Sequence, residues 1–341
     1  MTRRETLFNR YFGISLLALM LAAELFLRVA PGLGPGVFRG TYGNMLSMYL
    51  VIEDRLQTAG PNVTVLGLGD SLTMTQFQPV AFAETASLEA GTVFNAGFLG
   101  ASFPAQENLL NAVGREHLSN LENVFFFVNP RRLSADEEPL NDAFRVAIPA
   151  ADGSWREAWR TKRVAPLLDH SVLYGLSRHL STSAWREWIG SQDSWDRFEY
   201  LQPLGGSDWR GERASLDAPS YPYPPIVAIS PERVAEMRRV VGLLRGWGVE
   251  VSLLVSPIYP TLDAFASDTV RTEFDRVMRE VARQTGSRYL PELSAGFAPP
   301  RDGDYCDYGH MNRSGGEAFS RRLARHGDTL LQRGTTSGDA G

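Results

Sequence analysis

Three residue types that together perform nucleophilic catalysis stand at suggestive places in this chain: a serine, a histidine and an aspartate. Ser71 lies in the segment Gly-Leu-Gly-Asp-Ser-Leu-Thr, and His310 ends the segment Asp-Tyr-Gly-His. A serine hydroxyl is a weak nucleophile until a base accepts its proton, and the His310 imidazole is the candidate base. Asp307 precedes His310 by three residues, so a single tight loop can supply both the base and the carboxylate that orients it. These residues predict acyl transfer through an acyl-Ser71 intermediate.

Attack on an ester carbonyl also requires donors for the oxyanion that develops. The first candidate donor is the backbone N–H of Ser71. The second is Gly100, which closes the segment Asn-Ala-Gly-Phe-Leu-Gly and allows close approach of the backbone because it has no side chain. The third is Asn129, whose side-chain amide carries N–H groups. The predicted oxyanion hole therefore consists of Ser71, Gly100 and Asn129.

Each of these residues also has a purely structural interpretation. The alternative for Ser71 is a helix N-cap, and for His310 a surface or capping histidine, although the catalytic interpretation is favoured for both. Asn129 precedes a proline and is nearly as well explained as a turn residue, and Gly100 as a tight turn. The sequence alone leaves these alternatives open.

The neighbours of the candidate residues are charged. Asp70 is predicted to brace the turn before Ser71 rather than to take part in chemistry. Arg131 and Arg132 follow Asn129, and they could hold a substrate anion, although a solvated pair of surface arginines is the favoured interpretation.

Each candidate residue falls at the carboxyl end of a predicted strand or on the loop before the last helix, and the strands alternate with predicted helices. This pattern predicts a mainly parallel sheet of about five strands in a three-layer α/β/α sandwich, with ligands bound at the carboxyl ends of the strands. The expected strands are residues 63–68, a short strand ending at Asn95, 123–128, 250–255 and 288–290. The expected helices are residues 45–57, 105–116, 231–247, 263–284 and 313–331, the last with a capping box at Ser314-Gly-Gly-Glu317.

The composition excludes several classes of protein. The chain has 341 residues, of which 43% are hydrophobic, so there is ample apolar material for a core and intrinsic disorder is excluded as the main state. Its 34 Lys and Arg against 39 Asp and Glu give a net charge of −5, which disfavours a nucleic-acid partner. The single cysteine excludes an intrachain disulfide, and the other histidines show no metal-ligand spacing. No cofactor or metal is expected.

The N-terminus predicts a membrane anchor. Three arginines precede an apolar run over residues 11–27, in which Glu24 is the only charge. A basic flank before such a run, without a small-residue cleavage motif after it, favours an uncleaved signal anchor within residues 1–30. The basic flank should remain in the cytoplasm, which places the rest of the chain outside it. A cleaved secretory peptide is the alternative.

The rest of the chain divides into three predicted parts. Residues 31–60 form a connector and a first helix, residues 61–331 the catalytic domain, and residues 332–341 a disordered tail. Within the domain, residues 130–228 lack strand–helix alternation and hold six of the seven tryptophans, so they are interpreted as an insertion. Such a segment could stack on sugar rings, lie against a membrane or form a satellite hydrophobic cluster.

The order of the motifs resembles the SGNH/GDSL hydrolase superfamily: Gly-Asp-Ser, then Asn-x-Gly-x-x-Gly, then an Asn after the third strand, then Asp-x-x-His before the last helix. The resemblance covers about residues 61–129 and 231–331, and it implies a flavodoxin-like fold with Ser71, His310 and Asp307 as catalytic residues and Ser71, Gly100 and Asn129 as oxyanion donors. The third block departs from the family pattern, since Gly-x-Asn-Asp is replaced here by Phe-Val-Asn-Pro. With the anchor and the insertion, this looks more like the envelope branch, which includes alginate O-acetyltransferase-like and D-alanyl transfer protein-like members.

Two functions from different classes follow. The first is a membrane-anchored extracytoplasmic serine esterase or O-acyltransferase that acts on an ester, expected to be acetyl, of a small molecule or a cell-envelope polysaccharide. The second is a non-catalytic scaffold or binding module that partners a membrane O-acyltransferase. The distance from the Ser71 hydroxyl to the His310 ring discriminates between them.

Overall fold

The computed structural model describes residues 52–89, 91–135, 225–295, 302–307 and 309–331, the segments 198–200 and 207–209, and six single positions before residue 50. The chain divides into two compact units, residues 1–50 with 139–195 and residues 51–138 with 196–341. The second unit contains nearly all of the described residues. Most of the predicted anchor, of the 130–228 insertion and of the tail lies outside them. Among the helices of the described residues, none is long and apolar enough to cross a membrane.

The second unit is built on a five-stranded, wholly parallel sheet, as the alternating sequence pattern predicted. The strand order is β2-β1-β3-β6-β7. The strands are β1 (Val65–Leu68), β2 (Val93–Asn95), β3 (Asn123–Val128), β6 (Glu250–Val255) and β7 (Arg288–Tyr289). This is the flavodoxin-like order. After β2 is added on one side of β1, the later strands β3, β6 and β7 are added on the other side, so the order of the strands switches between β1 and β3. Ligand sites in such sheets lie at that point, beyond the carboxyl ends of the strands.

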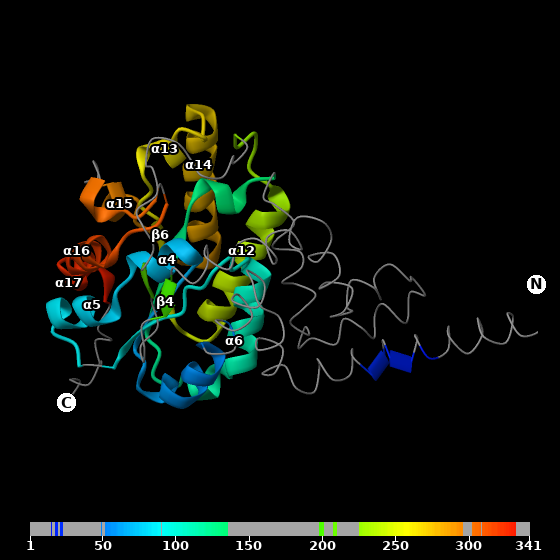
Figure 1. Cartoon of the computed structure of the whole chain (residues 1–341), viewed down its shortest axis with the longest axis vertical. Helices are drawn as coiled ribbons and strands as arrows, with labels where there is room; N and C mark the ends of the chain where they lie inside the picture. The colour runs from blue at the N-terminus through cyan, green and yellow to red at the C-terminus, as the bar shows by residue number, and fades with distance from the viewer. Residues whose placement is uncertain are drawn as a thin grey trace, which may run out of the picture. The chain divides into compact units, whose positions relative to one another are not determined.

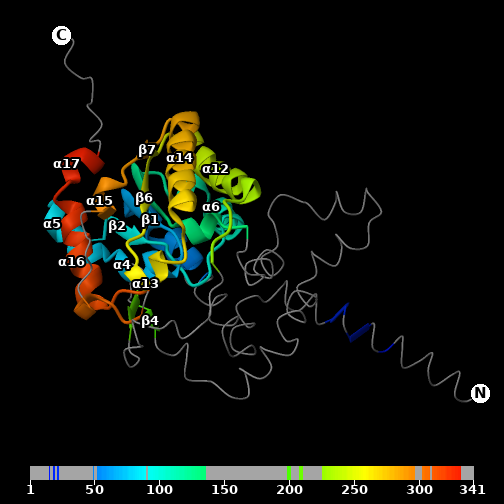
Figure 2. The same ribbon diagram turned by 90° about the horizontal axis from the view of Figure 1, so that it is seen from above.

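Helices cover both faces of the sheet, which gives the predicted α/β/α layers (Figures 1 and 2). One layer contains α5 (Pro79–Ala86), α16 (Arg313–Ala324) and α17 (Gly327–Leu330). The other contains α6 (Phe103–His117), α12 (Pro231–Gly246) and α14 (Asp268–Thr285). Shorter helices connect them: residues 52–59, η2 (Gly60–Asn62), α4 (Ser71–Gln76), η3 (Pro130–Leu133), α13 (Pro260–Asp263), α15 (Glu292–Ala295) and η4 (Asp302–Asp304).

The core beside the first strands is aromatic. Every residue of β1 and β3 is buried, as expected for strands that are covered on both faces. Phe77, directly after α4, packs against Phe82, Phe125 and Phe127 with ring centroids 5.4–5.9 Å apart. Phe127 contacts Phe319 of α16 at 6.1 Å, so α4 and α16 share one hydrophobic cluster. This cluster anchors the two helices that border the candidate site.

Two predicted helix boundaries are wrong. The helix expected over 263–284 begins at Asp268, because Ser267 is its N-cap and accepts the N–H of Val270, while residues 260–263 form the separate helix α13. The helix expected to run to residue 331 ends at Ala324, and α17 follows after a break.

The predicted capping box is also wrong. The N-cap of α16 is Asn312, whose side-chain oxygen accepts the N–H of Gly315, so Ser314 already lies in the first turn. Glu317 instead pairs with Arg313 and Arg321 on the helix surface.

The region interpreted as an insertion contains a described hairpin that the sequence did not predict. Strands β4 (Phe198–Tyr200) and β5 (Ser207–Trp209) pair antiparallel as a short hairpin. Strand β5 lies against α4 and α16, the two helices next to the candidate site. This places the hairpin at the rim of the second unit that bears the candidate residues (Figure 2).

Candidate active site

Ser71 is the first residue of α4, and two residues separate it from the end of β1. Gly67 in β1 and Gly69 in the turn after it are both required for reasons of space. A side chain at Gly67 would collide with the ring of Phe77, and one at Gly69 would collide with Thr73. The N-cap of α4 is Asp70 rather than Ser71, because the Asp70 Oδ1 atom accepts the Leu72 N–H at 2.9 Å. Asp70 therefore braces the turn, as predicted, and the N-cap interpretation of Ser71 is wrong.

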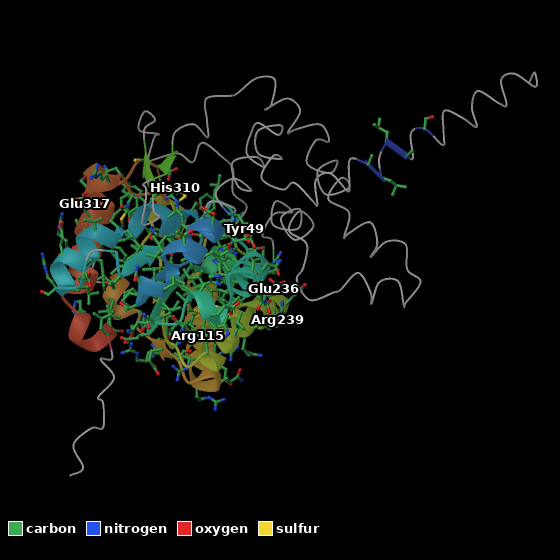
Figure 3. All side chains as sticks on the ribbon, turned by 90° about the horizontal axis from the view of Figure 1, so that it is seen from below. Tyr49, Arg115, Glu236, Arg239, His310 and Glu317 are labelled. Carbon is green, nitrogen blue, oxygen red and sulfur yellow. The ribbon has the colours of Figure 1, made fainter. Side chains whose placement is uncertain are left out.

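The structure brings together the three residues that the sequence singled out. The Ser71 Oγ lies 2.9 Å from Nε2 of His310, although the two residues are 239 positions apart. The other ring nitrogen of His310, Nδ1, lies 2.8 Å from Oδ2 of Asp307. With a proton on Nδ1 directed at Asp307, Nε2 is the acceptor for the Ser71 hydroxyl. Figure 3 shows His310 at the rim where the β4–β5 hairpin lies.

The loop that carries His310 is closed on itself. Asp307 Oδ1 accepts the backbone N–H groups of Gly309 and His310 at 2.7 and 2.6 Å. The Cys306 N–H donates to the His310 carbonyl at 2.9 Å. Asp307 thus both closes the loop and faces the imidazole, which fixes the relative positions of carboxylate and ring.

The His310–Asp307 pair is only slightly accessible, and this governs the charges of the two side chains. The side chains of His310 and Asp307 are 18% and 14% exposed. Burial opposes the charged imidazolium most strongly, but the charge and hydrogen bond of Asp307 together with the charge of Asp70 outweigh it, so the pKa of His310 is raised. Burial likewise opposes the Asp307 carboxylate, but His310 and the two backbone N–H groups lower its pKa. Asp307 is therefore ionised wherever His310 can act as a base.

Helices α4 and α16 are joined tightly behind Ser71 and His310. A side chain at Gly316 would collide with the Thr75 carbonyl, so the two helices approach as closely as their backbones allow. Ser320 Oγ donates to the Gln76 carbonyl at 3.1 Å, and it accepts the Gln78 N–H at 2.7 Å. The position of the nucleophile is therefore fixed relative to the helix that follows the base.

Gln76 connects three segments of the site, and sequence analysis missed it. Its side-chain nitrogen donates to the Pro257 carbonyl at 2.5 Å and lies 3.5 Å from the Gly309 carbonyl. Gln76 thereby links the nucleophile helix to the exit of β6 and to the His310 loop. No local pattern around Gln76 indicates this, because both partners are distant in sequence.

Asn95 binds the loop after β2 to the nucleophile helix. Its side-chain nitrogen donates to the carbonyls of Thr73 and Phe77, and its oxygen accepts the Gly97 N–H at 2.8 Å. Gly97 packs directly on the backbone of α4, with no room for a side chain. Gly100, at the end of this loop, has a positive φ of 63°, which supports the tight-turn interpretation. The loop of the predicted second oxyanion donor is thus attached to the helix that bears Ser71.

Asn129 has the structural role that was left open. It is the N-cap of η3, and its side-chain oxygen accepts the Arg132 N–H at 3.3 Å. Its side-chain nitrogen lies 3.5 Å from Oδ2 of Asp70. The amide group carries a second N–H, so the predicted role as an oxyanion donor remains a prediction.

The interpretation of Arg131 and Arg132 as a solvated pair is wrong for Arg132. Arg132 is 7% exposed, and its Nε atom lies 3.4 Å from Oδ2 of Asp70. Its guanidinium lies 5.4 Å from the centroid of the Phe103 ring. Burial of an arginine requires a partner charge, and that partner lies 62 residues earlier in the chain, so the neighbouring sequence gives no signal of it.

No group of three or more His, Cys, Asp or Glu side chains within the described ranges is arranged to hold a metal ion. The chemistry that the described groups can perform on their own is proton removal from Ser71 by His310, with Asp307 holding the ring.

The chain shows little similarity to known proteins. No protein-family model matches the chain, and no curated protein matches it in sequence. Among solved structures, the chain is similar to the lipase/acylhydrolase from Enterococcus faecalis, with 15% identity, coverage of 79% of this chain and 97% of that chain, and a TM-score of 0.37. A similarity of that degree supports no conclusion about function, so the proposal below rests on the site itself.

Proposed function

We propose that this chain is a serine esterase or O-acyltransferase of the SGNH/GDSL type, with Ser71 as nucleophile, His310 as general base and Asp307 as the residue that orients the base. One observation carries the proposal. Two hydrogen bonds of 2.9 and 2.8 Å connect a serine, an imidazole and a carboxylate in the order that acyl transfer requires. A non-catalytic scaffold has no need for this arrangement, so the geometry favours catalysis over the scaffold hypothesis.

The chemistry follows from the positions of the atoms. Ser71 Oγ attacks the ester carbonyl carbon while its proton passes to Nε2 of His310. The imidazolium is held by the Asp307 carboxylate, and the carbonyl oxygen becomes an oxyanion next to the proposed donors, the N–H groups of Ser71 and Gly100 and the Asn129 amide. Collapse of this intermediate expels the alcohol, which takes the proton from His310. Acyl-Ser71 remains.

The second half of the reaction repeats these steps with a new nucleophile. His310 takes a proton from water or from a sugar hydroxyl, and the resulting oxygen nucleophile releases the acyl group from Ser71. Water gives an esterase, and a sugar gives an O-acyltransferase. We propose an acetyl ester of a cell-envelope glycan as the substrate, supported by the resemblance of the motifs to the envelope branch of the superfamily.

The test of this function uses the full chain in detergent. The wild type should cleave p-nitrophenyl acetate and should be labelled by a fluorophosphonate probe, because both reactions require an activated serine. Ser71→Ala should abolish both signals. Ser314→Ala is the matched control, since Ser314 is exposed in the first turn of α16, where its hydroxyl donates to the side-chain oxygen of Asn312. Equal labelling of the wild type and Ser71→Ala would overturn the assignment.

A further inference from the structure

A buried ion pair lies directly behind the nucleophile. Asp70 is 8% exposed and Arg132 is 7% exposed, and their charged groups are 3.4 Å apart. Two charges removed from water cost free energy that their mutual attraction repays only in part. The reaction proposed above does not use either residue, so the pair requires another explanation.

The two oxygens of Asp70 have different partners. Oδ1 accepts the Leu72 N–H at 2.9 Å and so caps α4, whereas Oδ2 faces Arg132 and lies 3.5 Å from the Asn129 side-chain nitrogen. Ser71 stands between Asp70 and Leu72. A rotation of the Asp70 carboxylate would therefore move the backbone that carries the nucleophile.

Arg132 is well suited to hold this carboxylate still. It lies on η3, which follows β3, so it reaches Asp70 from the neighbouring strand of the sheet. The Phe103 ring, 5.4 Å from the guanidinium, restricts the plane of that group. A lysine ammonium would keep the charge but has no planar group to lie over the ring.

The pair also bears on the base. Two carboxylates act on His310: Asp307 from its own loop and Asp70 from the end of β1. Both favour the imidazolium, which cannot accept a proton from Ser71. A positive charge against Asp70 offsets one of these two influences, and Arg132, on η3, is the charged group paired with Asp70.

We propose that Arg132 is a positioning residue of this active site, which fixes the Asp70 carboxylate that caps the Ser71 turn and balances its charge beside His310. The proposal rests on the proposed function for its effect on rate. Its effect on the protonation of His310 does not depend on turnover.

The experiment compares four full-length variants in detergent, Arg132→Met, Arg132→Lys, Asp70→Asn and the double variant Asp70→Asn/Arg132→Met. The first readout is the pH profile of kcat and kcat/KM for p-nitrophenyl acetate. The second is an NMR titration with labelled histidine. The chain has five histidines, so His310→Ala assigns the signal.

Arg132→Met should lower kcat at least tenfold with little change in KM, and it should move the acid limb and the His310 titration to higher pH. Asp70→Asn should move both to lower pH, since asparagine still caps the helix but carries no charge. The double variant should return the titration close to that of the wild type and recover part of kcat. Arg132→Lys should restore the titration but only part of kcat.

Arg239→Met is the matched control, because Arg239 forms a more exposed ion pair with Glu107 at 3.2 Å between α12 and α6. It should leave both readouts unchanged.

If Arg132→Met lowers thermal stability but leaves kcat within twofold and the titration unmoved, Arg132 is only structural and the proposal is wrong. If Arg132→Met does not fold, the Asp70→Asn variant tests the proposal instead. A His310 titration that does not move to lower pH in Asp70→Asn would contradict the proposal equally. A wild type without esterase activity would refute the proposed function, while the NMR titration would still decide the role of Arg132.

Discussion

At the scale of single residues, the imidazole of His310 is subject to opposing influences. Burial disfavours its charged form, whereas the adjacent carboxylate of Asp307 favours it, and the result is a raised pKa. A general base must be neutral, so kcat/KM of the free enzyme should fall as the pH drops through this raised pKa. The enzyme is thus expected to work best at neutral to alkaline pH.

Asp307→Asn tests this balance. The substitution removes the charge that raises the pKa of His310, so the acid limb of the kcat/KM profile should move to lower pH. The rate should fall by about 10²- to 10⁴-fold, because the amide can no longer hold the required tautomer and stabilise the imidazolium. Steady-state kinetics from pH 5 to 9 would measure both effects. An acid limb that stays in place, with less than tenfold loss of rate, would contradict the role of Asp307.

The residues also mark where sequence reasoning stops. Ser71, Asp307 and His310 were identifiable because their types, spacing and positions after predicted strands match one chemistry. Arg132 was misjudged, since its burial depends on Asp70, which lies in the turn after a different strand, β1. Gln76 was missed for the same reason, since its partners are carbonyl groups of distant loops.

At the scale of elements, the close contact of α4 and α16 sets the distance between nucleophile and base. Gly316 makes this contact possible because a side chain there would meet the Thr75 carbonyl. Both helices are also anchored in the aromatic cluster around Phe77 and Phe127. The site is therefore as rigid as the packing of these two helices.

Gly316→Ala should push the helices apart. Overpacking of this kind costs about 1–3 kcal/mol of stability, and a displacement of about 1 Å at the reacting atoms can reduce the rate about 10²-fold. Thermal unfolding and esterase kinetics would measure the two losses. Gly242→Ala, at a helical glycine with no atom within 4 Å of the added group, is the control. It should keep full activity and gain up to about 1 kcal/mol. Unchanged kinetics for Gly316→Ala would show that this contact does not position the site.

Predictions at this scale succeeded where a local pattern is decisive. Strands β3 and β6 occur with the expected bounds. The helix expected over 263–284 was misplaced because the N-cap Ser267 and the separate helix α13 interrupt a continuous helical pattern. The β4–β5 hairpin was missed because its strands have three residues each, too few for a periodic signal.

At the scale of the whole molecule, the predicted N-terminal anchor would determine where the proposed reaction takes place. The basic flank and apolar run within residues 1–30 predict that the full chain is held in a membrane with its catalytic domain on the extracytoplasmic side. The substrate is then an ester that is present outside the cytoplasm, which agrees with the proposed envelope glycan.

Fractionation of expressing bacterial cells tests this arrangement. The full chain should sediment with membranes and resist extraction at high pH, because its attachment is hydrophobic. A protease added to spheroplasts should digest the domain while cytoplasmic markers survive. Replacement of Leu16 and Leu17 by arginine should release the protein from the membrane fraction. A full-length chain found only in the cytoplasmic supernatant would refute the localisation, but not the chemistry of Ser71.

The covalent intermediate is the most direct test of the central claim. Full-length protein is mixed with p-nitrophenyl acetate, quenched in acid within milliseconds and digested for mass spectrometry. The account predicts the added mass of one acetyl group on the peptide that contains Ser71, with none in Ser71→Ala and a much slower appearance in His310→Ala. Turnover of the ester without acetylation of Ser71 at any time point, or acetylation of a different residue at the catalytic rate, would contradict it.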